Sequence, residues 1–460
     1  MRIFHATLFL PLLSSLAFPA TWYVDGSNPN CPGTGTPASP FCTIGAAIAA
    51  ASPGDTIEVA AGIYPESLVV NQDDLTLLGA GASATSILGN PFSSPLLVGG
   101  LPGNVHSFTI RGFHITTSDP GPGEIVGLMI LQNSGPVRAV TVEGCRIEGC
   151  DLGISAQNAY DGSRIQIENV AVVNCGTGIQ LLGGDLAVRN CTVFDIEGIG
   201  IYSPLHSIFE VSDTIIASTG AWAIQRYWNS PTTIQRVLIH RNNLSPPATP
   251  PNPGPFMQYL AEGWPGGFGI WGPFTPLPGP VLEADPLFVD AAADDVRIQA
   301  GSPAIDAGEP GSVPVPVPAV SYDLLGFGHP RVMDGNFDMQ KRIDLGAVEF
   351  GGLLSPIDPH VGQPIVLEQS GFPGGLYGLF LGVPGTPYNM GAAGTLFLNP
   401  SFLFLLSSGP IPPSGQVTPL NVPAPPALAG RTLHFQGASL DRGASRALRL
   451  TNLEAVRVLP

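Results

Sequence analysis

A degenerate repeat with a period of 21 to 25 residues occupies the middle of the chain. Each copy has apolar or small residues at its first, fourth and sixth positions and ends in Gly-Ile or a similar pair. Short apolar runs at this period predict one coil of a parallel β-solenoid per copy, and the β-branched residues and glycines disfavour a helical repeat. The copies that align best are VEGCRIEGCDLGI (142–154), IENVAVVNCGTGI (167–179), VRNCTVFDIEGIGI (188–201) and VSDTIIASTGAWAI (211–224).

One position between the first and fourth residues of each copy carries a residue type that tolerates left-handed backbone. A tight bend between two strands demands that conformation, which glycine, asparagine and aspartate adopt most readily. Arg236 holds this position in the last unit, which begins at Ile234, and it breaks the pattern, so we expect the last coil to be less regular. The other bend residues are Gly112, Gly144, Asn169, Asn190 and Asp213.

The spacing of the cysteines within these coils predicts which of them are able to pair. Cys150 and Cys175 fall at the same position of adjacent coils, so their Cα atoms are expected about 5 Å apart. They are either a disulfide or two stacked, reduced thiols. Near the N-terminus, Cys31 and Cys42 flank the Gly- and Pro-rich loop CPGTGTPASPFC, which favours a local disulfide.

Segments on either side of the repeats define three regions of a chain that we expect to be all-β. Residues 1–20 have a positive start, an apolar core and a small final residue, which predicts a secretory signal peptide. Residues 21–350 form the solenoid domain, in which FCTIGAAIAAAS (41–52) is expected to be a short helix capping the open end. Residues 351–460 show strand-like runs separated by Pro and Gly turns, which predict a small C-terminal antiparallel β-sandwich.

The charge of the chain restricts its partners. The formal net charge is −17 and charged residues make up only 12% of the sequence. Nucleic acids and anionic membranes bind clustered cations, so neither is an expected partner. No later apolar stretch is long enough to be a transmembrane segment. A polyanionic glycan would need a divalent cation such as Ca²⁺ as a bridge, and no cofactor is otherwise required.

Several segments resemble a known family of proteins. TWYVDGSNPNCPGTGTPASPFCTIGAAIAAASPGDTIEVAAGIYPESLVV (21–70) resembles the N-terminal segment of secreted bacterial right-handed parallel β-helix proteins of the pectin-lyase-like superfamily. EADPLFVD, GSPAIDAG and DGNFDMQKRIDLGAVEF resemble the signature that closes the β-helix in many of them. The resemblance implies the fold and export. It leaves the activity open, because the superfamily contains lyases, hydrolases, esterases and binding proteins.

The resemblance implies that an active site would lie on an outer face of the helix. If the Ile of each Gly-Ile pair points inward, strict alternation turns the next residue outward. Neither that row nor the row two residues further on contains an acidic or basic side chain, although a bulge would turn Arg226 outward. The first row is Met129, Ser155, Gln180, Tyr202 and Gln225.

Acidic residues do occur in the turn that precedes this row. Glycoside hydrolysis needs two carboxylates, and lyase chemistry needs a base with a cation or Ca²⁺. Stacked coils would gather the turn acids into a catalytic or Ca²⁺ cluster; the alternative is that they are solvated turn residues. The catalytic candidates are Glu148, Asp151, Asp195 and Glu197.

Aromatic residues gather in two adjacent coils. Their flat faces would stack on sugar rings; the alternative is that they pack an irregular excursion at 242–282 against the solenoid. The candidates for ligand binding are Tyr202, Trp222, Tyr227 and Trp228, with Trp264 and Trp271 in the following loop.

The only lysine of the chain, Lys341, lies in the closing segment, where we expect Asp344 and Glu349 to tie off the last coil rather than to do chemistry. A nearby series, Asp334, Asn336 and Asp338, begins like a calcium loop, but Met339 stands where such a loop needs glycine. We therefore expect no dedicated metal site in this segment.

The sequence favours a secreted or cell-surface protein that binds an extracellular polysaccharide or a surface partner without catalysis. One alternative is a polysaccharide lyase or glycoside hydrolase. A second alternative is a structural surface spacer.

Overall fold

The computed structural model describes residues 19–99, 105, 107–118, 124–131, 139–157, 163–204, 208–227, 232–242, 257–264, 267–271, 281–308, 323–325, 343–350, 352–355, 359–390, 393–443 and 446–460. The predicted signal peptide and Lys341 lie outside these residues. No helix among them is long and apolar enough to cross a membrane.

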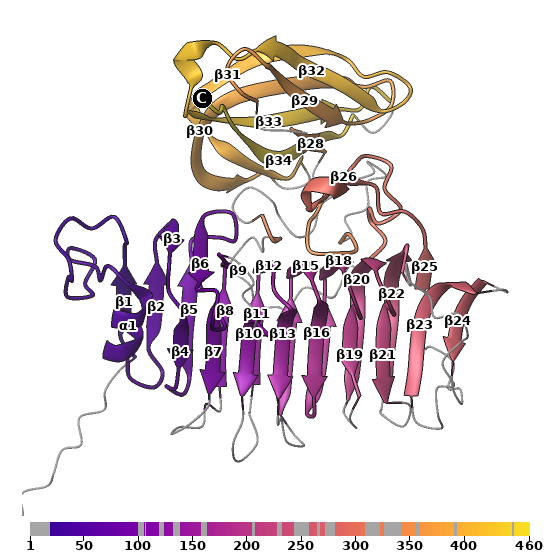
Figure 1. Cartoon of the computed structure of the whole chain (residues 1–460). Coiled ribbons are helices and arrows are strands. Elements are labelled where there is room, and N and C mark those ends of the chain that lie inside the picture. Colours follow the sequence, from indigo (N-terminus) through magenta and orange to yellow (C-terminus); the bar gives the residue numbers. More distant parts are fainter. Residues whose placement is uncertain are drawn as a thin grey trace, which may run out of the picture.

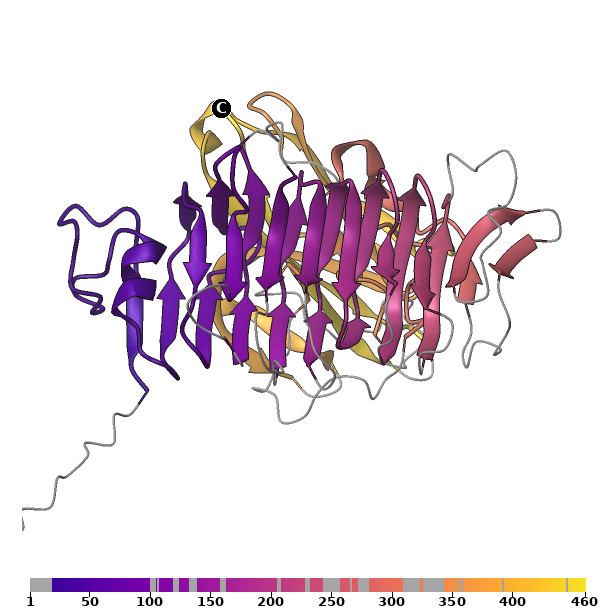
Figure 2. The same cartoon turned by 60° about the horizontal axis from the view of Figure 1, so that its bottom comes forward.

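The repeats form a right-handed parallel β-helix with three faces, as predicted (Figures 1 and 2). The first face consists of β1 (Thr21–Val24), β2 (Thr56–Val59), β5 (Leu75–Gly79), β8 (Ser107–Arg111), β11 (Ala139–Glu143), β14 (Arg164–Glu168) and β17 (Asp185–Arg189). The second consists of β3 (Gly62–Tyr64), β6 (Thr85–Gly89), β9 (His114–Thr117), β12 (Arg146–Glu148), β15 (Ala171–Cys175) and β18 (Thr192–Ile196).

The third face consists of β4 (Leu68–Val70), β7 (Leu96–Gly99), β10 (Val126–Leu131), β13 (Leu152–Gln157), β16 (Thr177–Leu182), β19 (Ile201–Ser203) and β21 (Ile224–Tyr227). Two long strands, β20 (Phe209–Thr219) and β22 (Thr232–His240), run through the bend between the first two faces and join them into one sheet. The third face continues antiparallel into β23 (Met257–Trp264) and β24 (Gly267–Trp271). Trp264 and Trp271 thus belong to a hairpin and not to the irregular loop that we expected.

Stacked aliphatic side chains fill the interior of the β-helix. The Ile of each Gly-Ile pair points inward and lies in register with the one in the next coil. The side chains of this ladder are buried, which confirms the alternation expected from the sequence. Its members are Leu128, Ile154, Ile179, Ile201 and Ile224.

The bend between the first two faces is left-handed at the predicted positions. Asn169, Asn190 and Asp213 have φ values of 54°, 51° and 52°. The expectation that Arg236 breaks this ladder is wrong, because its φ is 52°. Its guanidinium reaches back one coil to Asp213, with Nε 2.6 Å from Oδ1 and Nη2 3.1 Å from Oδ2. This bidentate ion pair offsets the cost of a left-handed arginine.

The N-terminal end is capped as expected. Helix α1 (Ile44–Ala50) buries Ile44, Ala47 and Ile48 against the first coil. Glu66 fixes its start by accepting hydrogen bonds from the backbone N–H groups of Ile44 and Gly45, at 2.8 and 2.9 Å.

The predicted disulfide between Cys31 and Cys42 is present, with Cα atoms 5.7 Å apart. The alternative of a bond between Cys150 and Cys175 is not realised. The free, buried cysteines are Cys145, Cys150, Cys175 and Cys191.

A closing segment begins at β25 (Val281–Glu283), which extends the second face by pairing in parallel with β22. Its next elements cover that face over the later coils: β26 (Phe288–Asp290), the 3₁₀ turn η1 (Ala291–Ala293) and β27 (Asp295–Ile298). Phe288 packs edge-on against Phe194 with ring centroids 4.9 Å apart. Around them lies an apolar cluster that also includes Ile215, Val296 and Phe350.

Two buried carboxylates hold the end of this segment, as predicted. Asp344 accepts hydrogen bonds from the backbone N–H groups of Asp306 and Phe350, and Glu349 accepts one from that of Asp344. These bonds satisfy backbone donors inside the fold, which is a structural role.

The described strands from Leu353 onward form an antiparallel β-sandwich, which lies above the β-helix in Figure 1. One sheet contains β28 (Leu353–Leu354), β29 (Pro364–Ser370) and β32 (Gln416–Pro423). The other has the order β31 (Thr395–Pro410), β30 (Leu376–Asn389), β33 (Thr432–Leu440) and β34 (Leu448–Arg457). The core of the sandwich contains side chains from both sheets, including Ile365, Leu367, Leu379, Phe435 and Val456.

Candidate functional sites on two faces of the β-helix

The third face carries a row of uncharged side chains, here called the third-face row, that lie in register. Strand pairing aligns the residues in the order that the sequence predicted: Met129, Ser155, Gln180, Tyr202 and Gln225. Parallel pairing spaces neighbouring members by about 4.8 Å. The row is therefore a regularly spaced ladder, although its members differ in type and Ser155 is buried.

Hydrogen bonds order the middle of the third-face row. Ser155 is fully buried, and its hydroxyl donates to Oε1 of Gln180 at 3.1 Å. Gln157 approaches the same hydroxyl with Nε2 at 3.5 Å. Gln180 and Tyr202 are half-exposed and present an amide and a phenol side by side. This surface offers hydrogen bonds and an aromatic face, but no ionisable acid or base.

The proposed aromatic platform is smaller than the sequence suggested. Trp222 is buried, with 7% of its surface exposed, so its ring does not face solvent. Tyr227 ends β21, and its side chain lies outside the described residues, as does Trp228 entirely. Tyr202 is therefore the candidate ring with a described, partly exposed side chain.

Arg226 points into the helix. The strand pairing around Arg226 has no bulge. Ile224 pairs with Ile201, Gln225 with Tyr202, and Arg226 with the buried Ser203. Only 4% of Arg226 is exposed, and burial lowers the pKa of its guanidinium to about 10. The alternative in which this arginine joins the outer surface of the third face is wrong.

The second face carries an acidic cluster, defined here as Glu148, Asp195 and Asp294. Glu148 lies in β12, and its Oε2 is 2.6 Å from Nε of Arg146 and 3.4 Å from Nε2 of His114 on the neighbouring coil. The contact with His114 and the charge of Arg146 lower the pKa of Glu148 to about 2. This carboxylate is ionised at neutral pH, so it is unsuited to be a general acid.

Asp294 has the opposite electrostatic environment. It follows η1 in a left-handed conformation, with φ of 55°. Burial and the charges of Asp195 and Glu148 raise the pKa of its carboxyl, while Arg146 opposes the shift. Two neighbouring carboxyl groups with pKa values shifted in opposite directions are typical of an acid and a base working together.

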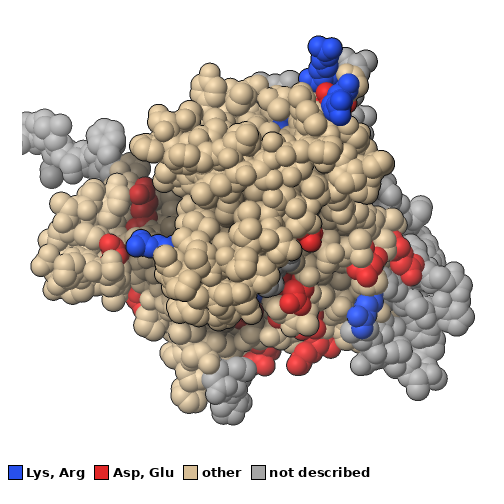
Figure 3. Space-filling model, turned by 90° about the horizontal axis from the view of Figure 1, so that it is seen from above, with Lys and Arg blue, Asp and Glu red and all other residues tan. Residues whose placement is uncertain are grey.

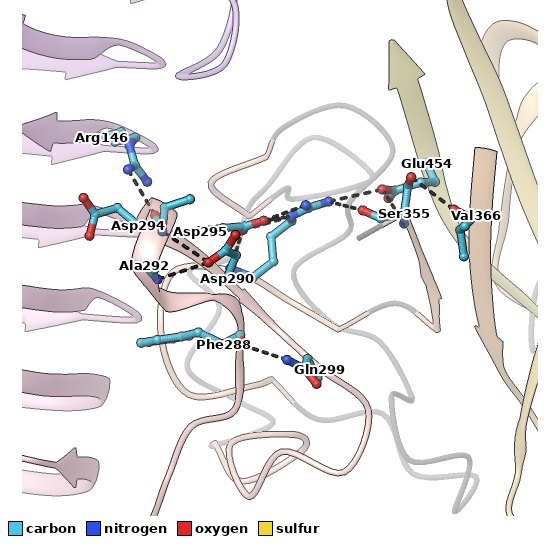
Figure 4. A network of polar contacts seen from close by, with 12 residues as sticks. Arg146, Phe288, Asp290, Ala292, Asp294, Asp295, Gln299, Ser355, Val366 and Glu454 are labelled. Atoms are coloured by element: carbon cyan, nitrogen blue, oxygen red, sulfur yellow. Dashed lines mark hydrogen bonds and ion pairs between the residues drawn. The ribbon is translucent and has the colours of Figure 1, made fainter. Parts of the chain in front are cut away.

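The closing segment brings Asp294 beside Arg146 (Figure 4). Arg146 donates from Nη2 to the backbone oxygen of Asp294 at 3.1 Å, across 148 positions of the chain. Asp290 caps η1 by accepting from the N–H groups of Ala292 and Ala293. The sequence interpretation missed Asp294 because nothing in VDAAADDVRI reveals that this turn returns to the repeat at 142–154.

The four predicted acids therefore separate into two groups. Glu148 and Asp195 lie close enough to Asp294 to shift its pKa. Asp195 is exposed at a left-handed bend position, with φ of 52°. Asp151 and Glu197 are exposed in the neighbouring turns, and Asp151 accepts from the N–H of Ile125 at 2.7 Å. Within the described residues, no three His, Cys, Asp or Glu side chains are arranged to hold a metal ion.

Comparison with known proteins supports the fold. The family model described as "Right handed beta helix region" matches residues 103–258. No curated protein matches the chain.

Three solved structures are similar in part. A rhamnogalacturonan lyase has 13% identity and a TM-score of 0.28, covering 48% of this chain and 82% of that chain. Pectate lyase Pel9A has 14% identity and a TM-score of 0.36, and the match covers 73% of this chain and 98% of that chain. Pectin methylesterase PemA from Erwinia chrysanthemi has 16% identity and a TM-score of 0.25, and the match covers 49% of this chain and 71% of that chain. Scores this low support no inference about activity.

Proposed function

We propose that this chain is an extracellular β-helix protein that binds a polysaccharide along the third-face row without cleaving it. The observation that supports this proposal is the in-register ladder of uncharged polar and aromatic side chains. Gln180, Tyr202 and Gln225 follow one another at the spacing of the coils and are partly exposed, so an extended polymer can contact all three.

The chemistry of the third-face row favours a neutral glycan. Amides such as Gln180 donate and accept hydrogen bonds, and the ring of Tyr202 provides a flat apolar face for a sugar ring. The net charge of −17 repels polyanions in the absence of a bridging cation. A neutral polysaccharide therefore meets less electrostatic opposition than an acidic one.

The experiment is a retention assay with neutral and acidic polysaccharides, with and without Ca²⁺. We expect retention of a neutral polysaccharide with no new reducing or unsaturated ends. Tyr202→Ala should weaken retention by roughly tenfold, the loss of about 1.4 kcal/mol of stacking, and Tyr202→Phe should keep most of it. The appearance of new chain ends would overturn the non-catalytic proposal. A folded protein that retains none of the polysaccharides would favour a structural spacer.

A second candidate function is cleavage of a polysaccharide at the acidic cluster. The specific observation in its favour is the opposite pKa shifts of Glu148 and Asp294. In this case Asp294 would be the general acid and Glu148 the charged partner. Glu148→Gln and Asp294→Asn would each abolish the release of chain ends, whereas Tyr202→Ala, on the third face, would leave it unchanged. Retention that is unaffected by Glu148→Gln, without chain ends, would favour the binding function.

A further inference from the structure

The C-terminal sandwich contains a long stretch without ionisable acids or bases. From Gln369 to Gly430 the sequence has no Asp, Glu, Lys, Arg or His, although the whole chain carries 35 acidic residues. Figure 3 shows the sandwich from above, and most of the surface that it presents is free of charged side chains. The repulsion between acidic molecules is therefore weakest at this part of the protein.

Within this stretch, β31 is an edge strand. It pairs antiparallel with β30, and the described residues show no strand on its other side. Its segment Ser401–Gly409 contains neither proline nor a charged residue, the two features that most often protect exposed edges. The outer edge thus offers backbone N–H and C=O groups to another strand.

The side chains of this edge are apolar and exposed on both faces of the strand. Phe404 and the next residue, Leu405, are 62% and 58% exposed, and successive residues of a strand point to opposite faces. Phe402 is 54% exposed. The other exposed apolar residues of the same hairpin are Leu376, Val383, Tyr388, Met390 and Leu406. Together they present roughly 600 Å² of apolar surface, taking about 150–250 Å² for each large side chain.

We propose that this hairpin is a self-association surface, on which the edge of β31 pairs antiparallel with β31 of a second copy of the chain. A two-fold axis makes the contact isologous, so one strand is its own partner. The contact is an edge contact, held by backbone hydrogen bonds along β31 and by lateral contacts between its side chains. The two sheets join into one continuous sheet of eight strands, twice the four in each copy.

A second copy of the chain provides hydrogen-bond partners for the backbone of the β31 edge, which a lipid surface does not. Phenylalanine and leucine side chains would enter a membrane readily, but the unpaired N–H and C=O groups of the edge would lose their hydrogen bonds to water there. A second β31 pairs the backbone groups of the edge and brings its apolar side chains beside those of the first copy on each face of the joined sheet. It also keeps the acidic β-helix domains away from the shared contact.

The first test measures the mass of the full chain by sedimentation over a micromolar concentration series. We expect a concentration-dependent doubling of mass. Phe404→Arg and Leu405→Arg should each raise the dissociation constant by at least roughly 30-fold, because each removes an apolar contact and the two-fold axis brings the two introduced like charges together. Phe92→Arg is the matched control, since Phe92 is 79% exposed outside the sandwich, and it should leave the constant unchanged. Leu405→Ser serves as a milder variant if an arginine prevents folding.

Two further measurements separate this contact from others. Added salt screens the repulsion of the acidic domains, so it should tighten the dimer; weakening by salt would contradict an apolar, uncharged interface. A cysteine scan over residues 402–408 should give one maximum of cross-linking, at the position nearest the two-fold axis. The native cysteines do not interfere, because each is disulfide-bonded or buried.

Three outcomes overturn the proposal. One is a chain that stays monomeric throughout the concentration series. Another is a dimer that survives Phe404→Arg and Leu405→Arg. The third is a monomer that binds vesicles of uncharged phosphatidylcholine through the same residues, which would assign the surface to lipid.

Discussion

Arg297 and Glu454 are 157 positions apart in the chain, yet Nη1 of the arginine lies 3.3 Å from Oε1 of the glutamate. Arg297 belongs to β27 in the closing segment of the β-helix, and Glu454 belongs to β34 of the sandwich. The same Nη1 also donates to the backbone oxygen of Ser355 at 3.0 Å, while Asp295 holds the rest of the guanidinium. One arginine therefore connects the two parts of the molecule.

Removing this arginine should weaken the attachment of the sandwich. The side chain of Glu454 is only 6% exposed, so Arg297→Met leaves a buried carboxylate without one of its charged partners. We expect a loss of about 2–4 kcal/mol in the free energy of unfolding of the sandwich region. Urea unfolding followed by proteolytic release of the sandwich measures this loss.

The matched control is the double variant Arg297→Met with Glu454→Gln. Removing both charges should recover a large part of the loss, because the buried Glu454 carboxylate is gone and the remaining Asp295 is partly exposed. A double variant as unstable as the sum of its single variants would show that the two residues are not coupled.

The ion pair between Asp213 and Arg236 should stabilise the bend through charge as well as conformation. Asp213→Asn preserves a residue that tolerates left-handed backbone but removes the partner of Arg236. We expect it to lower the free energy of unfolding by about 1–3 kcal/mol. Asn190→Asp, one coil earlier at the same bend position, is the control. If Asp213→Asn is as stable as the native protein, the arginine is held by other contacts.

Stability should depend on pH through Glu148. Its pKa falls from 4.5 in the unfolded chain to about 2 in the folded protein. The stabilisation by its charge is therefore complete above pH 4.5 and is lost as the pH falls towards 2. Comparing the urea midpoints of the native protein and Glu148→Gln from pH 2 to 6 isolates this group. The difference between the two should shrink as the pH falls, and a constant difference would contradict the assignment.

The four free cysteines should be unreactive in the native protein. Burial raises the pKa of the Cys145 and Cys175 thiols to about 12, so almost no thiolate is present at pH 8. Titration with a thiol reagent should detect no reactive thiol in the native protein. In denaturant without a reductant, it should detect four thiols. Two in denaturant would mean that Cys150 and Cys175 are bonded after all.

The sequence was sufficient to predict the β-helix because its evidence is local and repeated. Alternation of apolar residues fixed the inward ladder from Leu128 to Ile224, and the bend ladder followed from residues such as Asn190 and Asp213 that tolerate left-handed backbone. Arg236 shows the limit of that argument. Its residue type argues against the bend, and only the position of Asp213 one coil away explains why it fits.

The third-face row was predictable for the same reason, since strict alternation places Gln180 and Tyr202 side by side once the coil is known. The burial of Trp222 and the inward orientation of Arg226 depend on what packs around them, which no local pattern records. These two residues changed the expected surface of the third face.

By itself, the sequence determined the coil, its capping helix, the Cys31–Cys42 disulfide and the existence of a C-terminal β domain, because each depends on residues that are near one another or recur at a fixed period. Only the tertiary structure decided that Asp294 joins Glu148 and that Arg297 meets Glu454. Those contacts depend on where a non-repeating segment folds back onto the second face. Buried apolar contacts such as Phe194 with Phe288 set that position, and they couple residues across distances that periodicity does not encode.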